Sequence, residues 1–198
     1  MTELTWAGSR VTDSGRRLPG DAGVWVFIFA DTMAFGLFFL LFSRGRMGSP
    51  SLYRDSAQHL SVGLGVLNTL ILLTSGALMA LAVDAARRNE RRLVQRFTAG
   101  AIGVGLCFAL TKVFEYSGKI KAGFTLLTND FFMYYYVLTG VHFLHFVIGI
   151  VVLLILSAKA RNDAIDAHFR VWIESGASYW HMVDLLWIML FPLLYLQR

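Results

Sequence analysis

The sequence predicts an all-α integral membrane protein built as a bundle of five transmembrane helices. Of its 198 residues, 56% are hydrophobic, and the mean hydropathy is +0.57. Charged residues make up only 16%, whereas a soluble domain carries about 25%. Crossing the ~30 Å hydrocarbon core of a bilayer takes ~20 apolar residues in a helix. Five stretches are long and apolar enough, namely 22–43, 60–84, 96–117, 132–157 and 176–196.

Short polar segments, such as 44–59 and 85–95, join these stretches. Backbone groups in lipid must form their hydrogen bonds within the segment, so each stretch is expected to be helical. Short connections make neighbouring helices antiparallel, which predicts a single transmembrane domain over residues 22–198. Residues 1–21 are polar, and the apolar run that follows is too long for the ~7–15 residues of a signal-peptide core. We therefore expect a retained cytoplasmic tail.

The basic residues predict the orientation. Eleven Lys and Arg residues fall on the side of the N-terminus and six on the other side. Under the positive-inside rule, the N-terminus is cytoplasmic and the C-terminus faces outward, to the periplasm. The net charge of +5 comes from arginines in short loops beside apolar runs, which favours anionic lipid headgroups over nucleic acid as the partner.

Several ionisable residues lie at membrane depth, where a charge costs at least ~2.5–3.5 kcal/mol. Asp31 lies ~13 Å from the cytoplasmic end of the first span, Asp184 ~12 Å into the fifth and His145 ~18 Å into the fourth. His142 shares a helix face with His145, and His181 shares one with Asp184. Three interpretations remain open: a polar cluster that sets helix register, a contact with lipid headgroups or a partner subunit, and proton handling or metal binding.

Lys112 and Glu115 lie three residues apart near the outer end of the third span. This spacing predicts an ion pair, with Lys112 reaching outward to the headgroup region. A contact with a lipid phosphate or another subunit is the alternative.

The histidines limit the possible cofactors. Of five histidines, we expect His59 and His168 in loops, which leaves three in spans. A two-haem cytochrome b needs four histidines, so this class is excluded. A single haem held by two histidines between the fourth and fifth spans is still possible. An independent one-haem membrane cytochrome, or a carrier that uses Asp31 and the histidines, is therefore the competing class of function.

Four strings carry a resemblance to a known family: LNTLILLTSG (67–76), KVFEY (112–116), FF…TGVHFLH (131–145) and ESGASYWHMVDLLW (174–187). In this order and spacing, they resemble subunit III of the cytochrome c oxidase and quinol oxidase superfamily. The resemblance runs from about Gly23 to the C-terminus. Larger members have seven helices, and this chain looks like the five-helix form that lacks the first two.

The resemblance implies an accessory subunit of an oxidoreductase in the bacterial inner membrane, not itself an enzyme, with neither haem nor copper. Such subunits pack against the catalytic subunit, hold phospholipids in a cleft and stabilise the proton-uptake side. Asp31 corresponds to the family's buried carboxylate of the first span. The other matching polar positions are Glu115, His142, His145, Glu174, Trp180, His181 and Asp184.

Within the superfamily, KVFEYSGKIKAG (112–123) and the ending LFPLLYL (190–196) look most like NorE, the accessory protein associated with nitric oxide reductase. Cytochrome c oxidases usually carry Glu at the position of Asp31, Gln at that of Lys112 and Phe at that of Met182. The resemblance thus leaves two partners: a nitric oxide reductase, or the catalytic subunit of a cytochrome c or quinol oxidase.

Overall fold

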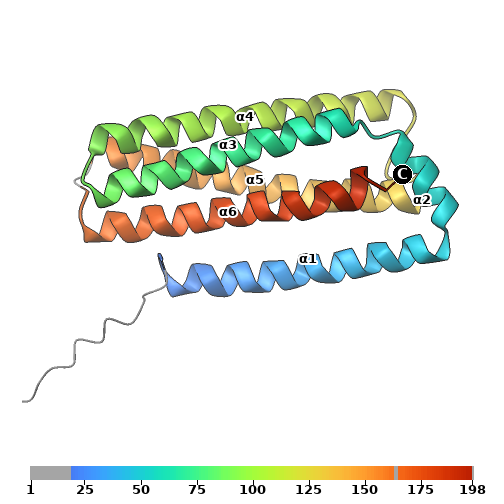
Figure 1. Cartoon of the computed structure of the whole chain (residues 1–198), viewed down its shortest axis with the longest axis horizontal. Helices are drawn as coiled ribbons and strands as arrows, with labels where there is room; N and C mark the ends of the chain where they lie inside the picture. Colours follow the sequence, from blue (N-terminus) through green and yellow to red (C-terminus); the bar gives the residue numbers. More distant parts are fainter. Residues whose placement is uncertain (1–18, 163–164, 198) are drawn as a thin grey trace, which may run out of the picture.

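Five long helices form the protein, as the sequence predicts (Figure 1). The computed structural model describes residues 19–162 and 165–197, so nearly all of the predicted tail lies outside the described residues. All five helices are long and apolar enough to cross a membrane. They are α1 (Ala22–Gly48), α3 (Val62–Arg87), α4 (Arg91–Lys121), α5 (Asp130–Asn162) and α6 (Ala167–Tyr195).

The helices are longer than the apolar stretches that predicted them. Hydropathy marks only the part of a helix inside hydrocarbon, and the helix can continue into the headgroup region, where water satisfies its ends. Side chains cap four of the starts. Asn129 accepts from the Phe132 amide at 3.0 Å, and Ser61 from the Leu64 amide at 3.4 Å. Asp21 accepts from the Gly23 amide and Asp166 from the Phe169 amide, both at 2.7 Å. His168 therefore lies in the first turn of α6, and its predicted place in a loop is wrong.

The segment 44–59 is not simply a loop, because it contains the short helix α2 (Pro50–Gln58). Pro50 occupies the first helical turn, where its missing N–H costs nothing. Tyr53 is buried, with its ring centroid 5.2 Å from that of Phe42 and 5.7 Å from that of Phe131. Burial raises the pKa of Tyr53 to about 12, so its phenol stays neutral. Through these aromatic contacts, α2 connects the end of α1 to α5.

Helices α3 to α6 pack as a four-helix bundle, with α3 against α4 and α6, and α5 against the same two (Figure 1). Helix α6 is the central element of the core and buries the two indole rings of Trp180 and Trp187 completely. Helix α1 lies beside α5 and α6 and buries only Phe35 and Phe42. This lighter packing leaves room between α1 and the bundle.

The α3–α4 turn, the α5–α6 connection and the start of α1 lie at the same end of the molecule (Figure 1). Asn89 takes a left-handed conformation in the α3–α4 turn, with φ of 61°. Arg91 donates from Nε to the Ala160 carbonyl at 2.8 Å and from its guanidinium to the Arg161 carbonyl. An arginine near one helix terminus thereby satisfies carbonyls at the end of another helix.

Candidate functional site

Asp31 and His145 form a polar contact between α1 and α5. The distance from Asp31 Oδ1 to His145 Nε2 is 3.1 Å, and each side chain is 12% exposed. His145 Nδ1 lies 2.8 Å from the Val141 carbonyl, and because a carbonyl only accepts, Nδ1 must carry a proton. A hydrogen bond between Nε2 and Oδ1 at this distance requires a proton on one of these two atoms.

Aromatic residues enclose this pair. The ring centroids of Phe27 and Phe35 lie 6.4 Å and 5.9 Å from that of His145. The Tyr179 hydroxyl donates to the His145 carbonyl at 3.0 Å. Asp31 Oδ2 is buried and has no hydrogen-bond partner among the described residues.

His181 and Asp184 form a second pair, on α6, with 3.6 Å between His181 Nδ1 and Asp184 Oδ2. Asp184 is 5% exposed, and its Oδ1 has no hydrogen-bond partner within the described part of the chain. The pair lies against Gly76 of α3, where an added Cβ would come within 3.3 Å of His181 Nδ1 and closer still to Asp184 Oδ2. The glycine therefore leaves room for the pair to face α3.

The sequence places Asp31, His145 and Asp184 at overlapping depths, but the structure divides the polar residues into two separate pairs. His145 pairs with Asp31, and Asp184 with His181. In residues 19–162 and 165–197, no three His, Cys, Asp or Glu residues come together in a way that could hold a metal ion. The polar side chains of these helices are thus arranged as two separate pairs.

Lys112 and Glu115 form the predicted ion pair, with 3.0 Å between Nζ and Oε2. The prediction that Lys112 reaches outward is wrong, because the residue is 1% exposed. The Tyr195 hydroxyl lies 2.9 Å from Lys112 Nζ and donates to Glu115 Oε1 at 2.7 Å. Four aromatic rings also surround the ammonium group. Their centroids lie 4.8–5.6 Å from Lys112 Nζ, and they belong to Trp187, Tyr116, Tyr135 and Tyr195.

His142 and Trp180 connect helices inside the bundle. The fully buried His142 has its Nε2 3.0 Å from the Val183 carbonyl, which joins α5 to α6. Trp180 donates from its indole N–H to Ser75 Oγ at 3.1 Å, and Ser75 donates to the Ala101 carbonyl at 2.7 Å. This chain of hydrogen bonds joins α6, α3 and α4.

Glu174 lies near the start of α6, at the end of the bundle where the arginines gather. It accepts from Arg87 at 2.8 Å and from the Gly20 amide at 3.2 Å. It therefore joins α6 to α3 and to the segment that leads into α1. Tyr195 completes the Lys112 pair but is not among the site residues that the sequence predicts. Its place in the LFPLLYL ending was the available signal.

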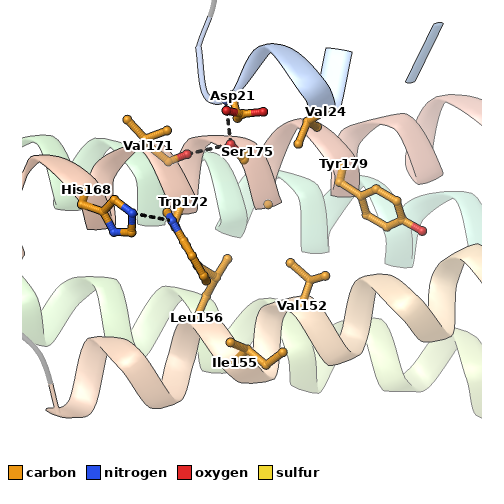
Figure 2. A pocket seen from close by; sticks show the side chains of 11 residues that line it. Asp21, Val24, Val152, Ile155, Leu156, His168, Val171, Trp172, Ser175 and Tyr179 are labelled. Atoms are coloured by element: carbon orange, nitrogen blue, oxygen red, sulfur yellow. Dashed lines mark hydrogen bonds between the residues drawn. The ribbon is translucent and has the colours of Figure 1, made fainter. Parts of the chain in front are cut away.

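A cavity of about 550 Å³ lies where the start of α1 faces α5 and α6 (Figure 2). Its walls are mainly apolar, including Val24, Val152 and Leu156. The polar groups include Ser175, which accepts from the Asp21 amide at 2.9 Å. Such a space suits an apolar chain with a polar end.

The whole chain matches a known family. The model of the family "Cytochrome c oxidase subunit III" matches residues 3–197. Cytochrome c oxidase subunit 3 of Synechocystis sp. is 31% identical over 177 residues, which are 88% of this chain and 74% of the relative. Cytochrome c oxidase subunit 3 of Corynebacterium diphtheriae is 29% identical over 194 residues, which are 96% of this chain and 93% of the relative.

A third relative, the "Heme-copper oxidase subunit I+III" of Aeropyrum pernix, is 28% identical over 182 residues, which are 88% of this chain and 22% of the relative. The family match over residues 3–197 includes all five long helices and the polar residues described above. The chain belongs to the cytochrome c oxidase subunit III family.

Proposed function

We propose that this protein is a cofactor-free accessory subunit that stabilises the catalytic subunit of a respiratory haem–copper superfamily complex. The observation that carries the proposal is the family match over residues 3–197. A relative named "subunit I+III" supports the partnership, because its name joins the catalytic and accessory subunits. The buried polar pairs would hold the bundle in register beside that partner.

As the finer assignment, we propose a nitric oxide reductase as the partner. The two segments that resemble NorE meet in the fold, because Lys112 and Glu115 of the first contact Tyr195 of the second. Cytochrome c oxidases usually carry Gln at position 112, and a neutral Gln could not form this ion pair. Of the three departures from the oxidase pattern, at Asp31, Lys112 and Met182, the one at Lys112 is thus part of a connected cluster of polar side chains.

The second candidate is subunit III proper of a cytochrome c or quinol oxidase. It is favoured by the relatives, since the similar proteins from Synechocystis and Corynebacterium diphtheriae are both named cytochrome c oxidase subunit 3. Either partner places the chain in a bacterial inner membrane. The arginine-rich end of the bundle would then face the cytoplasm.

A phospholipid is the ligand we propose for the cavity between α1, α5 and α6. Its apolar walls suit an acyl chain, and the polar residues Asp21, His168 and Ser175 suit the glycerol and headgroup region. Lys159 Nζ lies 4.5 Å from the ring centroid of Trp172 beside this cavity, which would place a cation near the lipid phosphate.

The decisive experiment is purification of the tagged chain from its native membrane in mild detergent. We expect a nitric oxide reductase catalytic subunit to be recovered with it, and recovery of a terminal oxidase instead would select the second candidate. If the chain is recovered alone with a stoichiometric Soret band that is lost in His145→Ala, it is an independent cytochrome and the proposal fails.

A further inference from the structure

The segment that leads into α1 is joined to α6 through two backbone amides. The Gly20 amide donates to Glu174 Oε2 at 3.2 Å, and the Asp21 amide donates to Ser175 Oγ at 2.9 Å (Figure 2). Glu174 is itself held in place, because its Oε1 accepts from Nε and Nη2 of Arg87 at 3.0 Å and 2.8 Å. Two consecutive residues before α1 thus bind two consecutive residues of α6. We call Gly20, Asp21, Glu174 and Ser175 the latch.

The latch depends on a glycine at position 20. Gly20 has a φ of 81°, a left-handed conformation that residues with a Cβ rarely adopt. A Cβ added there would lie 2.7 Å from Ser175 Oγ and 2.8 Å from the Ser175 backbone nitrogen. Because real Cβ atoms do not approach other atoms so closely, a larger residue at position 20 would have to move the segment away from α6.

The half of α1 that begins at the latch packs lightly against the rest of the protein. The buried residues of α1 are Phe35 and Phe42, and both lie at or beyond the middle of the helix. In the half that begins at the latch, Asp31 contacts His145, whereas Phe27 is 45% exposed. The cavity of about 550 Å³ and a second cavity of about 460 Å³ lie beside this half. The latch is therefore a large share of what holds it against the bundle.

Two latch residues are also walls of the cavities. Asp21 and Ser175 line the larger cavity, and Asp21 also lines the smaller one. The latch therefore sets the distance between the start of α1 and α6 at the polar end of the larger cavity. Asp21 is exposed, so water can replace Ser175 as the partner of its amide, and opening leaves no buried donor without an acceptor.

We propose that the latch is a gate that controls the exchange of the ligand in the cavity between α1, α5 and α6. When the Gly20 and Asp21 amides leave α6, the first half of α1 moves outward and the bound lipid exchanges with the bilayer. When the amides bind again, the lipid is retained. The far half of α1 stays in place, because Phe42 remains packed against Tyr53 and Phe131. The proposal rests on the proposed phospholipid ligand and adds the residues that control its exchange.

The first test measures lipid exchange in Gly20→Ala. This variant opens the latch but changes no residue that lines the described cavity. The full chain is purified with its lipid, phosphatidylethanolamine with deuterated acyl chains is added, and replacement of the retained lipid is followed by mass spectrometry. We expect exchange about 10-fold faster than in the parent, the factor for one lost hydrogen bond to a charged group. An unchanged rate would overturn the gate and leave the phospholipid ligand intact.

Gly123→Ala is the matched control. Gly123 also has a positive φ, 86°, but a Cβ there would meet nothing within 4 Å. Its exchange rate should equal that of the parent, and an equal acceleration in both variants would overturn the gate. Glu174→Ala removes the acceptor of the Gly20 amide without straining the backbone, so it should also speed exchange even if Gly20→Ala does not fold. Asp84→Ala, which breaks the exposed ion pair with Arg88, is the control for Glu174→Ala.

The second test measures the movement of α1 without reference to a ligand. Spin labels are placed on the full chain at the exposed Val26 and Arg92 near the latch, and at Met47 and Ile120 at the other end of the bundle. The exposed Cys107 is replaced by Ser to prevent its labelling. Pulsed electron paramagnetic resonance should show a longer or broader distance in Gly20→Ala for the first pair only. Unchanged distances would overturn the gate. If the parent retains no phospholipid, the ligand proposal fails, and these distances still decide whether the latch opens.

Discussion

Lys112 illustrates how a charged residue can exist inside this bundle without reaching water. Its ammonium group is compensated by Glu115, by the Tyr195 hydroxyl and by four aromatic rings. A buried ion pair adds little stability compared with apolar residues of similar size, but removing one partner leaves an uncompensated charge. The cluster should therefore respond to single and double substitutions in opposite ways.

We expect Lys112→Met to destabilise the chain by about 3–5 kcal/mol, because Glu115 would remain buried without its cation. The double variant Lys112→Met with Glu115→Leu should recover most of that loss. Unfolding of the purified chain in detergent measures both. The exposed Lys121→Met is the matched control and should stay within about 0.5 kcal/mol of the parent. A double variant as unstable as the single one would contradict this account.

Substitution of Asp31 tests whether the proton between Asp31 and His145 matters for the complex. In Asp31→Asn, an amide N–H can still donate to His145 Nε2, so the contact between α1 and α5 can persist while the exchangeable proton is lost. We expect normal membrane insertion but a shorter lifetime of the complex or of its sustained turnover. Insertion is measured by membrane fractionation, and lifetime by repeated activity assays. Unchanged lifetime and activity would make Asp31 a packing residue.

At the scale of the helices, α6 packs closely against α4 and α5 because glycines of those two helices lie against the Trp180 ring. A Cβ on Gly149 of α5 would lie 2.7 Å from the Trp180 ring, and one on Gly105 of α4 would lie 3.2 Å away. Trp180 is fully buried, so the ring has little room to move. These two contacts bring three helices together around one indole.

Gly149→Ala should therefore destabilise the bundle by about 1–3 kcal/mol through overpacking. Gly140→Ala is a matched control on the same helix, because a Cβ there meets nothing within 4 Å. It should be neutral or stabilise the chain by up to about 1 kcal/mol, since alanine favours the helix. Thermal unfolding in detergent distinguishes them, and equal effects of the two substitutions would refute the close contact.

At the scale of the whole molecule, the five candidate spans within residues 19–162 and 165–197 predict that the start of α1 and the end of α6 lie on opposite sides of the membrane. We expect the N-terminus and the α3–α4 turn to be cytoplasmic, because arginines concentrate at that end. Alkaline phosphatase is active only outside the cytoplasm, so its fusion to the C-terminus should be active. Fusion after Asn89 should be inactive. The opposite pattern would reverse the proposed orientation.

Much of the fold could be predicted because hydropathy is a local property. Each of the five apolar stretches in the sequence corresponds to one long helix. The ion pair of Lys112 and Glu115 could also be predicted, since residues three apart on a helix are neighbours. Helix α2 could not, because its polar sequence is stabilised by the burial of Tyr53 between α1 and α5.

The sequence by itself determined the five membrane-spanning helices and the polar residues along each, because both follow from spacing within one segment. Only the tertiary structure decided that Asp31 pairs with His145 while Asp184 faces a hollow with His181. It also decided that Lys112 is enclosed by rings from α4, α5 and α6 instead of reaching the headgroups. Those outcomes depend on which helix faces meet, and packing between segments distant in the sequence sets that choice.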